Sequence, residues 1–373
     1  METKVVKLDP NSLDVHTIRE AAGIVNAGGL VAFPTETVYG IACRVDVRSL
    51  AKLNRAKGRD AEKHYTLHIG DKSDVEKYVP TIGIRGRKLV EHAWPGPLTL
   101  VFELSHEDIG KQRRSLERDV FENLYRDDSI GIRCPDDAIA LALLRETHSP
   151  VVAPSANKAG QPPAVNAEGV LAQLTGEVDL LLDAGPCKYG QSSTVVKIGK
   201  KGLEVLRQGA YPQIELDEVS QVKFLFVCTG NTCRSPMAEG MFRKYFAEKL
   251  GCTIDELDKI GYIIRSAGVM DTGGCSASVE AISACAAKGV DIRAHRSRAL
   301  SARLIEESDF ILAMCRTHQQ QVVALSPECA SKCVLLAEGE DIADPIGQPQ
   351  EVYNSCADLI EKAVRARIGE LVI

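Results

Sequence analysis

The chain alternates between short apolar runs and segments whose apolar residues recur every three or four positions. The recurring spacing predicts a helix that begins at Asp14, a residue type that caps helix N-termini, and ends at Gly28. A second helix is predicted over residues 48–57. The apolar runs, which are bounded by turn residues, predict strands at residues 30–33, 67–69, 98–102, 130–133, 151–153, 180–182, 194–198 and 204–206. This mixture of helices and short strands is typical of an α/β fold.

The pattern lapses near residue 210 and begins again after residue 220. Residues 208–220, QGAYPQIELDEVS, lack apolar periodicity. We therefore predict one domain over residues 1–212, a linker over residues 213–220 and a second domain over residues 221–373. In the second domain, apolar runs predict strands at residues 224–227 and 310–314, and a helical pattern covers residues 236–250.

Composition and charge are those of an ordinary soluble protein of two or three domains. The 373 residues are 45% hydrophobic and 26% charged, with a net charge of −6. An acidic chain argues against a wholly basic nucleic-acid binder, and no apolar run approaches the length of a membrane span. The N-terminal sequence METKVVKLDP has no apolar signal core, so we expect a cytoplasmic protein with no membrane partner.

Two further compositional features bear on the chemistry. The twelve cysteines lack the regular spacing of a disulfide framework, and nine lie from Cys228 onward, so we expect reduced thiols with one reactive pair. Residues 105–128 are polar and include Lys111, Arg113 and Arg114. We interpret this segment as a solvated insertion or lid, with a nucleic-acid contact as the alternative.

The sequence VCTGNTCRS at residues 227–235 lies between a predicted strand and a predicted helix. Five mostly small residues separate Cys228 from Arg234, so the backbone can turn its N–H groups toward a phosphate at the positive end of the helix. The positive electrostatic potential at the start of the helix also favours the thiolate form of a cysteine, which is the nucleophilic form. We therefore expect a lowered pKa at Cys228. Arg234 can donate to two phosphate oxygens at once. The loop therefore predicts a phosphatase site.

A cysteine phosphatase also needs a proton donor for the leaving group, and Asp344 in the sequence DIADPIG is the candidate. The alternative is that Asp344 and Pro345 only mark a turn. Together with Ser266 in SAGV, His295 in HRSR and the strand at residues 310–314, these signals resemble the low-molecular-weight protein phosphatase family. The resemblance covers roughly the last 150 residues, a normal size for one domain.

The resemblance implies a role for each of these residues. Cys228 would be the nucleophile that forms a phosphocysteine intermediate, Arg234 the phosphate clamp, and Asp344 first the acid and then the base. The family needs no metal or other cofactor, and phosphorylated proteins would be the substrates. The residues that form or support the phosphate loop would be Thr229, Gly230, Asn231, Thr232, Cys233, Ser235, Ser266 and His295. Cys233 is either a small buried side chain or the partner of Cys228 in a reversible disulfide.

The resemblance also narrows the substrate. Tyrosine-selective members surround the site with aromatic residues, whereas the single tryptophan here, Trp94, lies in the other domain and Ile346 follows the Asp-Pro pair. The sequence CTGNTCRSPMAE resembles the bacterial protein-arginine phosphatases. In this chain the branched side chain of Thr232 would narrow the entrance of the site. We therefore expect phosphoarginine as the substrate, with a protein-tyrosine phosphatase as the alternative.

A third interpretation is an arsenate reductase, which uses the same fold with a relay of cysteines. Cys315 follows the strand at residues 310–314, but Gln321 and Val322 stand where the relay needs a resolving cysteine. Cys329 and Cys333 lie further along and would serve only if their segment moves.

Short polar motifs follow several predicted strands of the first domain, where α/β folds place ligand sites. The segment Thr35-Glu36-Thr37 offers hydroxyls and a carboxylate to an amino-acid ligand. Lys57 and Arg59, at a helix end, suit a polyphosphate, although a solvated helix C-terminus is the alternative. His68 alternates with apolar residues and is equally consistent with a buried core histidine. Further polar residues at strand ends are Ser155, Asn157, Ser193, Thr194 and Arg207.

The ordered motifs PTETVYG, KGR, LHI, WPGPLTLV, GIRCP, APSAN, DAGP, SSTVV and LRQGA resemble the YrdC-type threonylcarbamoyl-AMP synthase family over residues 12–210. The resemblance implies a twisted α/β sheet, followed by a Rossmann-like phosphatase domain with a parallel sheet flanked by helices. It implies formation of threonylcarbamoyl-AMP from L-threonine, bicarbonate and ATP, with Mg²⁺ arriving on the nucleotide and no metal site in the protein. The downstream partners would be the transferases that place the threonylcarbamoyl group on tRNA.

The same resemblance assigns the ligand-binding residues. ATP would be held by Lys57, Arg59, Ser155, Asn157 and Arg207, and threonine by Thr35, His68, Arg133 and Ser193. The chain departs from the family after KGR, where Asp60 and Lys63-His64-Tyr65 stand in place of a proline and an Asn-Pro-Leu segment. The alternatives are a domain that binds RNA or nucleotide without catalysis, and carbamoyl-adenylate chemistry on another substrate.

Overall fold

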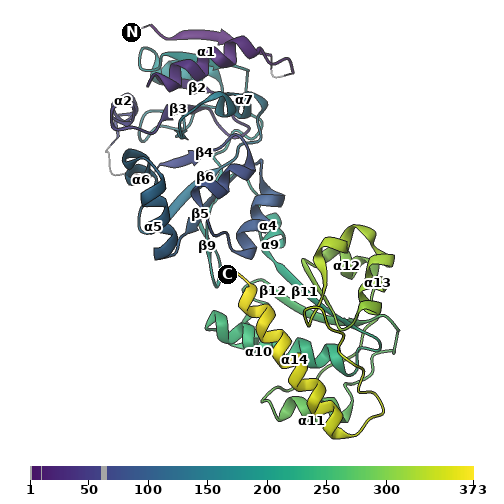
Figure 1. Cartoon of the computed structure of the whole chain (residues 1–373). Coiled ribbons are helices and arrows are strands. Elements are labelled where there is room, and N and C mark those ends of the chain that lie inside the picture. Colours follow the sequence, from purple (N-terminus) through teal and green to yellow (C-terminus); the bar gives the residue numbers. More distant parts are fainter. Residues whose placement is uncertain (1, 10, 60–64) are drawn as a thin grey trace. The chain divides into compact units, whose positions relative to one another are not determined.

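A computed structural model describes residues 2–9, 11–59 and 65–373 of the chain. The chain forms two compact units, Met1–Ser220 and Gln221–Ile373 (Figure 1). Within the described residues, no helix is long and apolar enough to cross a membrane.

Ten strands of the first unit form one mixed sheet in the order β1-β8-β2-β3-β7-β4-β6-β5-β9-β10. The strands are β1 (Lys4–Lys7), β2 (Val31–Phe33), β3 (Gly40–Arg44), β4 (Thr66–His68), β5 (Leu98–Glu103), β6 (Ser129–Arg133), β7 (Val151–Val152), β8 (Leu180–Asp183), β9 (Thr194–Gly199) and β10 (Gly202–Arg207). All eight strands predicted in this half are present. The sequence analysis missed β1, a mostly exposed strand that pairs in parallel with β8, and β3, which pairs antiparallel with β2.

Helices cover both faces of this sheet. They are α1 (Val15–Asn26), α2 (Val47–Lys57), α3 (Val75–Tyr78), α4 (Ile84–Ala93), α5 (His106–Ser115), α6 (Arg118–Leu124), α7 (Ala138–Glu146), α8 (Ala167–Leu174) and α9 (Gln213–Ser220). Val31 and Phe33 of β2 pack into a core with α1 and α7, whereas the intervening Ala32 packs into a second core with α2, α4 and α8. Because strands buried on both faces need apolar residues at every position, they appear in the sequence as continuous apolar runs.

The local signals for α1 and α2 are also confirmed. The Asp14 side chain accepts a hydrogen bond of 3.0 Å from the His16 N–H and so caps α1. Gly58 ends α2 in the left-handed conformation, with φ of 60°. The polar segment at residues 105–128 forms α5, which buries Asp108 and Gln112, and α6, which buries Val120 and Leu124.

The segment predicted as a linker is instead the helix α9, which packs against α4. Leu216 is fully buried in the core of the first unit, whereas Ile214 is 74% exposed. The helix has a weakly amphipathic sequence with few buried positions, which is why its apolar periodicity is hard to see.

The second unit contains a four-stranded parallel sheet in the order β12-β11-β13-β14. Its elements are β11 (Val222–Cys228), α10 (Arg234–Leu250), β12 (Tyr262–Gly268), α11 (Val279–Ala286), α12 (Ala302–Glu307), β13 (Phe310–Ala313), α13 (Arg316–Leu325), β14 (Cys333–Leu335) and α14 (Gln350–Glu370). Alternate residues of β11 face opposite cores. Phe224 packs against Phe242 of α10, whereas Leu225 and Val227 join a core that includes Ile305 of α12. The predicted strands and helix of this domain are thus confirmed.

We predict that Leu216→Ala lowers the free energy of unfolding of the first unit by about 2–4 kcal/mol, because it removes a fully buried side chain from the core. Urea denaturation of the full chain, followed by the fluorescence of the single and buried Trp94, measures this change. The matched control Ile214→Ala lies on the exposed face of the same helix and should change stability by less than about 0.5 kcal/mol. Equal effects of the two substitutions would contradict the packing of α9.

Two candidate active sites

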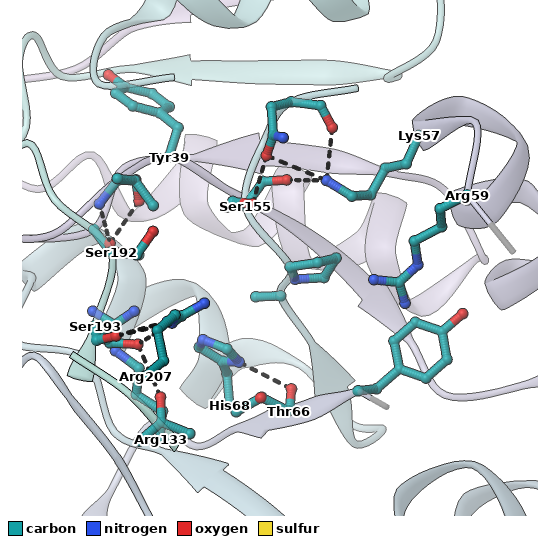
Figure 2. A pocket seen from close by; sticks show the side chains of 18 of the residues that line it. Tyr39, Lys57, Arg59, Thr66, His68, Arg133, Ser155, Ser192, Ser193 and Arg207 are labelled. Atoms are coloured by element: carbon teal, nitrogen blue, oxygen red, sulfur yellow. Dashed lines mark hydrogen bonds between the residues drawn. The ribbon is translucent and has the colours of Figure 1, made fainter. Parts of the chain in front are cut away.

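A cavity of about 330 Å³ opens in the first unit. It is lined by all nine residues that the sequence analysis assigned to ATP or threonine, together with further residues from the ends of several strands (Figure 2). The nine are Thr35, Lys57, Arg59, His68, Arg133, Ser155, Asn157, Ser193 and Arg207. Residues spread over positions 35 to 207 therefore line a single cavity. The local sequence pattern had indicated only that each of them lies at the end of a predicted strand or helix.

Arg133 ends β6 and is paired in register with His68 at the end of the neighbouring β4. Its Nη2 donates hydrogen bonds of 2.8 Å each to Glu36 Oε1 and Thr37 Oγ1. Arg133 Nε and Glu36 Oε2 are buried and have no hydrogen-bond partner within the described residues. The ion pair thus fixes the guanidinium while leaving an N–H group for another acceptor, such as a ligand carboxylate.

A second arginine, Arg207, lines the same cavity. Arg207 Nη2 donates to the Ser193 carbonyl oxygen at 2.9 Å and to Ser193 Oγ at 3.2 Å. Burial and the positive charge of Arg133 both lower the pKa of Arg207. Two guanidinium groups that repel each other across a cavity are stabilised by an anion between them.

His68 is both a buried histidine and a cavity residue, so the two interpretations of its sequence position are compatible. Its Nδ1 lies 3.1 Å from the Thr66 carbonyl oxygen, which accepts the Nδ1 proton and leaves Nε2 as an acceptor. Burial, and then the charge of Arg133, lower the pKa of His68 to about 3. The imidazole is therefore neutral and suited to accept a hydrogen bond. Thr35, in contrast, uses its hydroxyl locally, donating to the Val38 carbonyl oxygen at 2.7 Å.

Lys57 is buried at the end of α2. Its ammonium group donates to the carbonyl oxygens of Ser155 and, at 2.7 Å, Asn157. The Ser155 hydroxyl donates in turn to Asn157 Oδ1 at 2.5 Å. These contacts hold the end of α2 against the segment after β7, so the predicted cations and the predicted Ser155–Asn157 motif form one wall of the cavity.

Arg59 is held by residues that the sequence analysis did not assign. Its Nε donates to Asn54 Oδ1 at 3.0 Å, and its guanidinium lies 4.4 Å from the centre of the Tyr65 ring. The Tyr65 hydroxyl donates to the same Asn54 oxygen at 2.8 Å. Of the residues that depart from the family pattern, Tyr65 thus supports Arg59 directly, and the departures at residues 60–64 lie outside the described part of the chain.

The second site surrounds the loop between β11 and α10, with Cys228 as the last residue of the strand and Arg234 as the first of the helix. Cys228 Sγ lies 2.9 Å from Ser235 Oγ and accepts a hydrogen bond of 3.3 Å from the Asn231 N–H. Asn231 has a φ of 53°, a left-handed conformation that asparagine tolerates better than most residues. The turn at Asn231 therefore points its N–H group at the sulfur.

Asn231 also links the loop to the rest of the unit, which confirms the proximity of the predicted supporting residues. Its side-chain amide donates to Ser235 Oγ and Ser266 Oγ, both at 2.8 Å. Its carbonyl oxygen lies 2.8 Å from His295 Nε2. Ser266 in turn donates to Glu239 at 2.6 Å. Glu239 has no counterpart in the sequence analysis, because a single glutamate within a helix carries no distinguishing signal.

Arg234 is buried and held at three points. Its Nη1 donates to the Ile342 carbonyl oxygen at 2.9 Å, and its Nη2 donates to Thr229 Oγ1 at 3.0 Å and to the Asp344 carboxylate. Arg234 Nε is buried without a hydrogen-bond partner in the described residues. The structure thus brings together the predicted nucleophile, clamp and acid, and it shows Asp344 paired with Arg234.

The expected pKa of Cys228 is wrong in direction. Burial is the largest influence on the thiol and raises its pKa. The hydrogen bond with Ser235, the charge of Arg234 and the loop N–H groups lower it but do not outweigh burial. The sequence shows the helix terminus and the arginine, whereas the nearly complete burial of the sulfur depends on tertiary packing.

The other cysteines also form no disulfide in the structure. Cys233 Sγ lies 3.4 Å from the Tyr353 hydroxyl and 3.6 Å from Ser278 Oγ. Cys329 and Cys333 are buried, and burial raises the pKa of Cys333 to about 12. Cys315 Sγ lies 3.1 Å from His318 Nδ1.

Ile346, which follows Asp344 and Pro345, is 65% exposed. Trp94, the single tryptophan, is buried in the core of the first unit. Across the described parts of both units, no group of three or more histidine, cysteine or acidic side chains is arranged to hold a metal ion.

Comparisons with known proteins agree with these two sites. Residues 23–209 match the Sua5/YciO/YrdC family, described as "Telomere recombination", and residues 223–371 match the low molecular weight phosphotyrosine protein phosphatase family. The second unit is also 36% identical over 147 residues to a protein-arginine-phosphatase of Geobacillus stearothermophilus, covering 38% of this chain and 90% of that protein. The chain belongs to both families.

A curated protein and a solved structure that resemble this chain both come from Pyrococcus abyssi. A threonylcarbamoyl-AMP synthase is 32% identical over 232 residues, which cover 62% of this chain and 65% of that protein. This chain therefore spans about two thirds of the length of that relative. The crystal structure of the P. abyssi Sua5 protein complexed with L-threonine has the same fold, with a TM-score of 0.51, 24% identity, and coverage of 72% of this chain and 92% of that one.

We predict that the rate at which iodoacetamide alkylates Cys228 rises steadily with pH from neutrality to above about 8.5, because a raised pKa places the thiolate in that range. Ser235→Ala removes a hydrogen bond that lowers the pKa and should move the profile to higher pH. Mass spectrometry of the Cys228 peptide measures the rate, and labelling of the exposed Cys275 controls for the reagent. A plateau reached below pH 7 would contradict the prediction.

Proposed function

We propose that the first unit forms threonylcarbamoyl-AMP from L-threonine, bicarbonate and ATP. The observation that carries this proposal is the convergence of all nine predicted ligand residues on one cavity that contains two mutually repelling arginines. The P. abyssi relative is named for this activity. The product would supply transferases that modify tRNA.

The cavity offers different chemistry to the two substrates. Arg133, with its unpartnered Nε, would hold the threonine carboxylate, while the neutral His68 and Ser193 would contact its polar groups. Lys57, Arg59 and Arg207 would face the phosphates of ATP, with Ser155 and Asn157 completing that wall, and Mg²⁺ would arrive on the nucleotide.

The reaction then needs positioning and charge rather than a protein nucleophile. The neutral threonine nitrogen attacks the bicarbonate carbon, and the departing hydroxide takes a proton from that nitrogen and leaves as water, which gives a carbamate. A carbamate oxygen attacks the α-phosphorus of ATP, and pyrophosphate leaves with the electron pair of the broken P–O bond. Cations already fixed in a buried cavity stabilise the charge that develops on the phosphates.

For this unit we predict release of pyrophosphate from ATP that requires both threonine and bicarbonate. Arg133→Leu should raise the KM for threonine by about 100-fold, because it removes a charge-assisted contact, and leave the KM for ATP within about threefold. Arg55→Leu, on the exposed face of α2, is the matched control and should match the unsubstituted chain. Nucleotide binding without turnover would indicate a binding module, and turnover that threonine does not stimulate would indicate another acceptor.

We further propose that the second unit hydrolyses protein phosphoarginine. The thiolate form of Cys228, after loss of its proton to water, would attack phosphorus while the P–N bond breaks, and Asp344 would protonate the departing guanidine nitrogen. Water, deprotonated by Asp344, would then attack phosphorus and release Cys228 and inorganic phosphate. Support comes from the assembled Cys228, Arg234 and Asp344, from the Geobacillus relative's name, and from the presence of Ile346 rather than an aromatic residue after Asp344-Pro345.

The substrate preference gives a direct test. The full chain should hydrolyse phosphoarginine peptides with a kcat/KM at least about tenfold above that for phosphotyrosine peptides, because Ile346, rather than an aromatic residue that could stack on a phenyl ring, follows Asp344-Pro345. Thr232→Ile should reduce this ratio, since it removes the hydroxyl at the mouth of the site, whereas Thr232→Ser should retain it. Cys228→Ser is the blank for contaminating phosphatase. A phosphotyrosine preference in the unsubstituted chain would make this unit a tyrosine phosphatase.

A further inference from the structure

A chain of hydrogen bonds connects the phosphate clamp of the second unit to α13, and we propose that His318 is a positioning residue that holds Arg234 through Thr229. The proposal rests on the proposed phosphatase function of this unit and adds a residue that acts on its anion-binding arginine. Within the described part of the chain, His318 makes hydrogen bonds with Thr229 and Cys315 but not with the Cys228 thiol. Its effect on the site would therefore act through the orientation of Arg234.

The geometry of the connection is specific. Thr229, the first residue after Cys228, places its hydroxyl oxygen 3.0 Å from Arg234 Nη2 and 2.9 Å from His318 Nε2. His318 Nδ1 lies 3.1 Å from Cys315 Sγ. His318 is buried in the first turn of α13, a helix of ten residues that follows β13.

The count of protons assigns a direction to this chain. Arg234 has only donors, so Thr229 Oγ1 must accept the bond from Nη2. The single hydroxyl proton of Thr229 then goes to His318 Nε2, which must be unprotonated to accept it. The remaining imidazole proton lies on Nδ1 and is donated to Cys315 Sγ. With this arrangement every hydrogen on oxygen or nitrogen along the chain has an acceptor, and only the weakly donating S–H of Cys315 has none within the described residues. The reverse direction would instead leave the stronger donor, the Thr229 hydroxyl, without an acceptor.

The charges around His318 favour the neutral ring that this arrangement requires. Burial, and then the positive charge of Arg234, lower the pKa of His318 to about 4. Asp344 and Asp341 act in the opposite direction and are outweighed. A neutral histidine with Nε2 as an acceptor is therefore the stable form across the neutral range.

The consequence for binding follows from the contacts of Arg234. Its guanidinium plane is fixed by the Ile342 carbonyl oxygen on Nη1 and by Thr229 on Nη2, while Nε remains for a ligand. Asp344 also contacts Nη2, but a substrate phosphate would compete with it for that group. The Thr229–His318 pair is thus the contact on the Nη2 side that remains when an anion binds. Loss of this contact should lower the affinity for phosphate more than it lowers the rate of the chemical step.

The test compares His318→Leu with His318→Gln in the full chain. Leucine removes the acceptor for Thr229, and we expect the KM for a phosphoarginine peptide and the inhibition constant for inorganic phosphate to rise together by about tenfold, the effect of roughly one lost hydrogen bond. The kcat should stay within about threefold. Glutamine keeps a side-chain acceptor at the position of Nε2 and should restore both constants to near the unsubstituted values. Gln320→Leu, exposed on the same helix, is the matched control.

A double-mutant cycle separates positioning from a general structural role. In a Thr229→Val background the hydroxyl that His318 orients is absent, so His318→Leu should have no further effect on the inhibition constant for phosphate. The proposal would be overturned if His318→Leu weakened phosphate inhibition equally in the Thr229→Val background and in the unsubstituted background. It would also be overturned if His318→Leu did not weaken phosphate inhibition at all.

Failure of the proposal and failure of the proposed function give different results. If the unsubstituted chain hydrolyses neither phosphoarginine nor phosphotyrosine peptides, the phosphatase function fails. Isothermal titration with inorganic phosphate then still tests the role of His318, since the same tenfold weakening and the same loss of effect in Thr229→Val are expected for anion binding alone. An unchanged phosphate affinity in His318→Leu overturns the positioning role whatever the enzyme hydrolyses.

Discussion

Both candidate sites depend on positive charge that is buried and held in a fixed direction. Removing an arginine or lysine from water costs several kcal/mol unless partners replace the lost hydration. In this protein Arg133 is paired with Glu36, and Arg234 is paired with Asp344, but in each case the partners use only part of the guanidinium. The Nε group of each arginine stays buried and unpartnered in the described residues. A ligand anion is the group that best completes such a set of donors.

The sheets explain how these charges come to converge. In the first unit, β4 and β6 run in parallel and in register, so His68 and Arg133 end side by side. In the second unit, Cys228 ends the central strand β11 opposite Gly268 of β12. Adjacent parallel strands end at the same edge of a sheet, so residues far apart in sequence meet there without long loops. The helices on both faces then exclude water from beneath the sites.

The sequence predicts the parts of this arrangement that have a local cause. Continuous apolar runs, the Asp14 cap and the helix over residues 48–57 each reflect forces within a few residues, and these predictions are confirmed. The convergence of Lys57, Arg133 and other site residues could be expected only through family resemblance, because no local force brings residues of different strands together. The burial of Leu216 and the raised pKa of Cys228 were missed for the same reason. Both arise from packing between distant segments.

Asp344 shows how the fixed clamp and the proposed chemistry fit together. As the partner of Arg234 Nη2, its carboxylate offsets the cost of burying the guanidinium when no substrate phosphate is present. A phosphate group carries more negative charge than a carboxylate and can take both Nε and Nη2, so its binding would release Asp344 from the arginine. The released carboxylate would lie next to the leaving group that it must protonate. This exchange is productive only if Arg234 keeps its direction while one partner leaves, and the remaining contacts, to Ile342 and to Thr229 with His318 behind it, are those that would hold it.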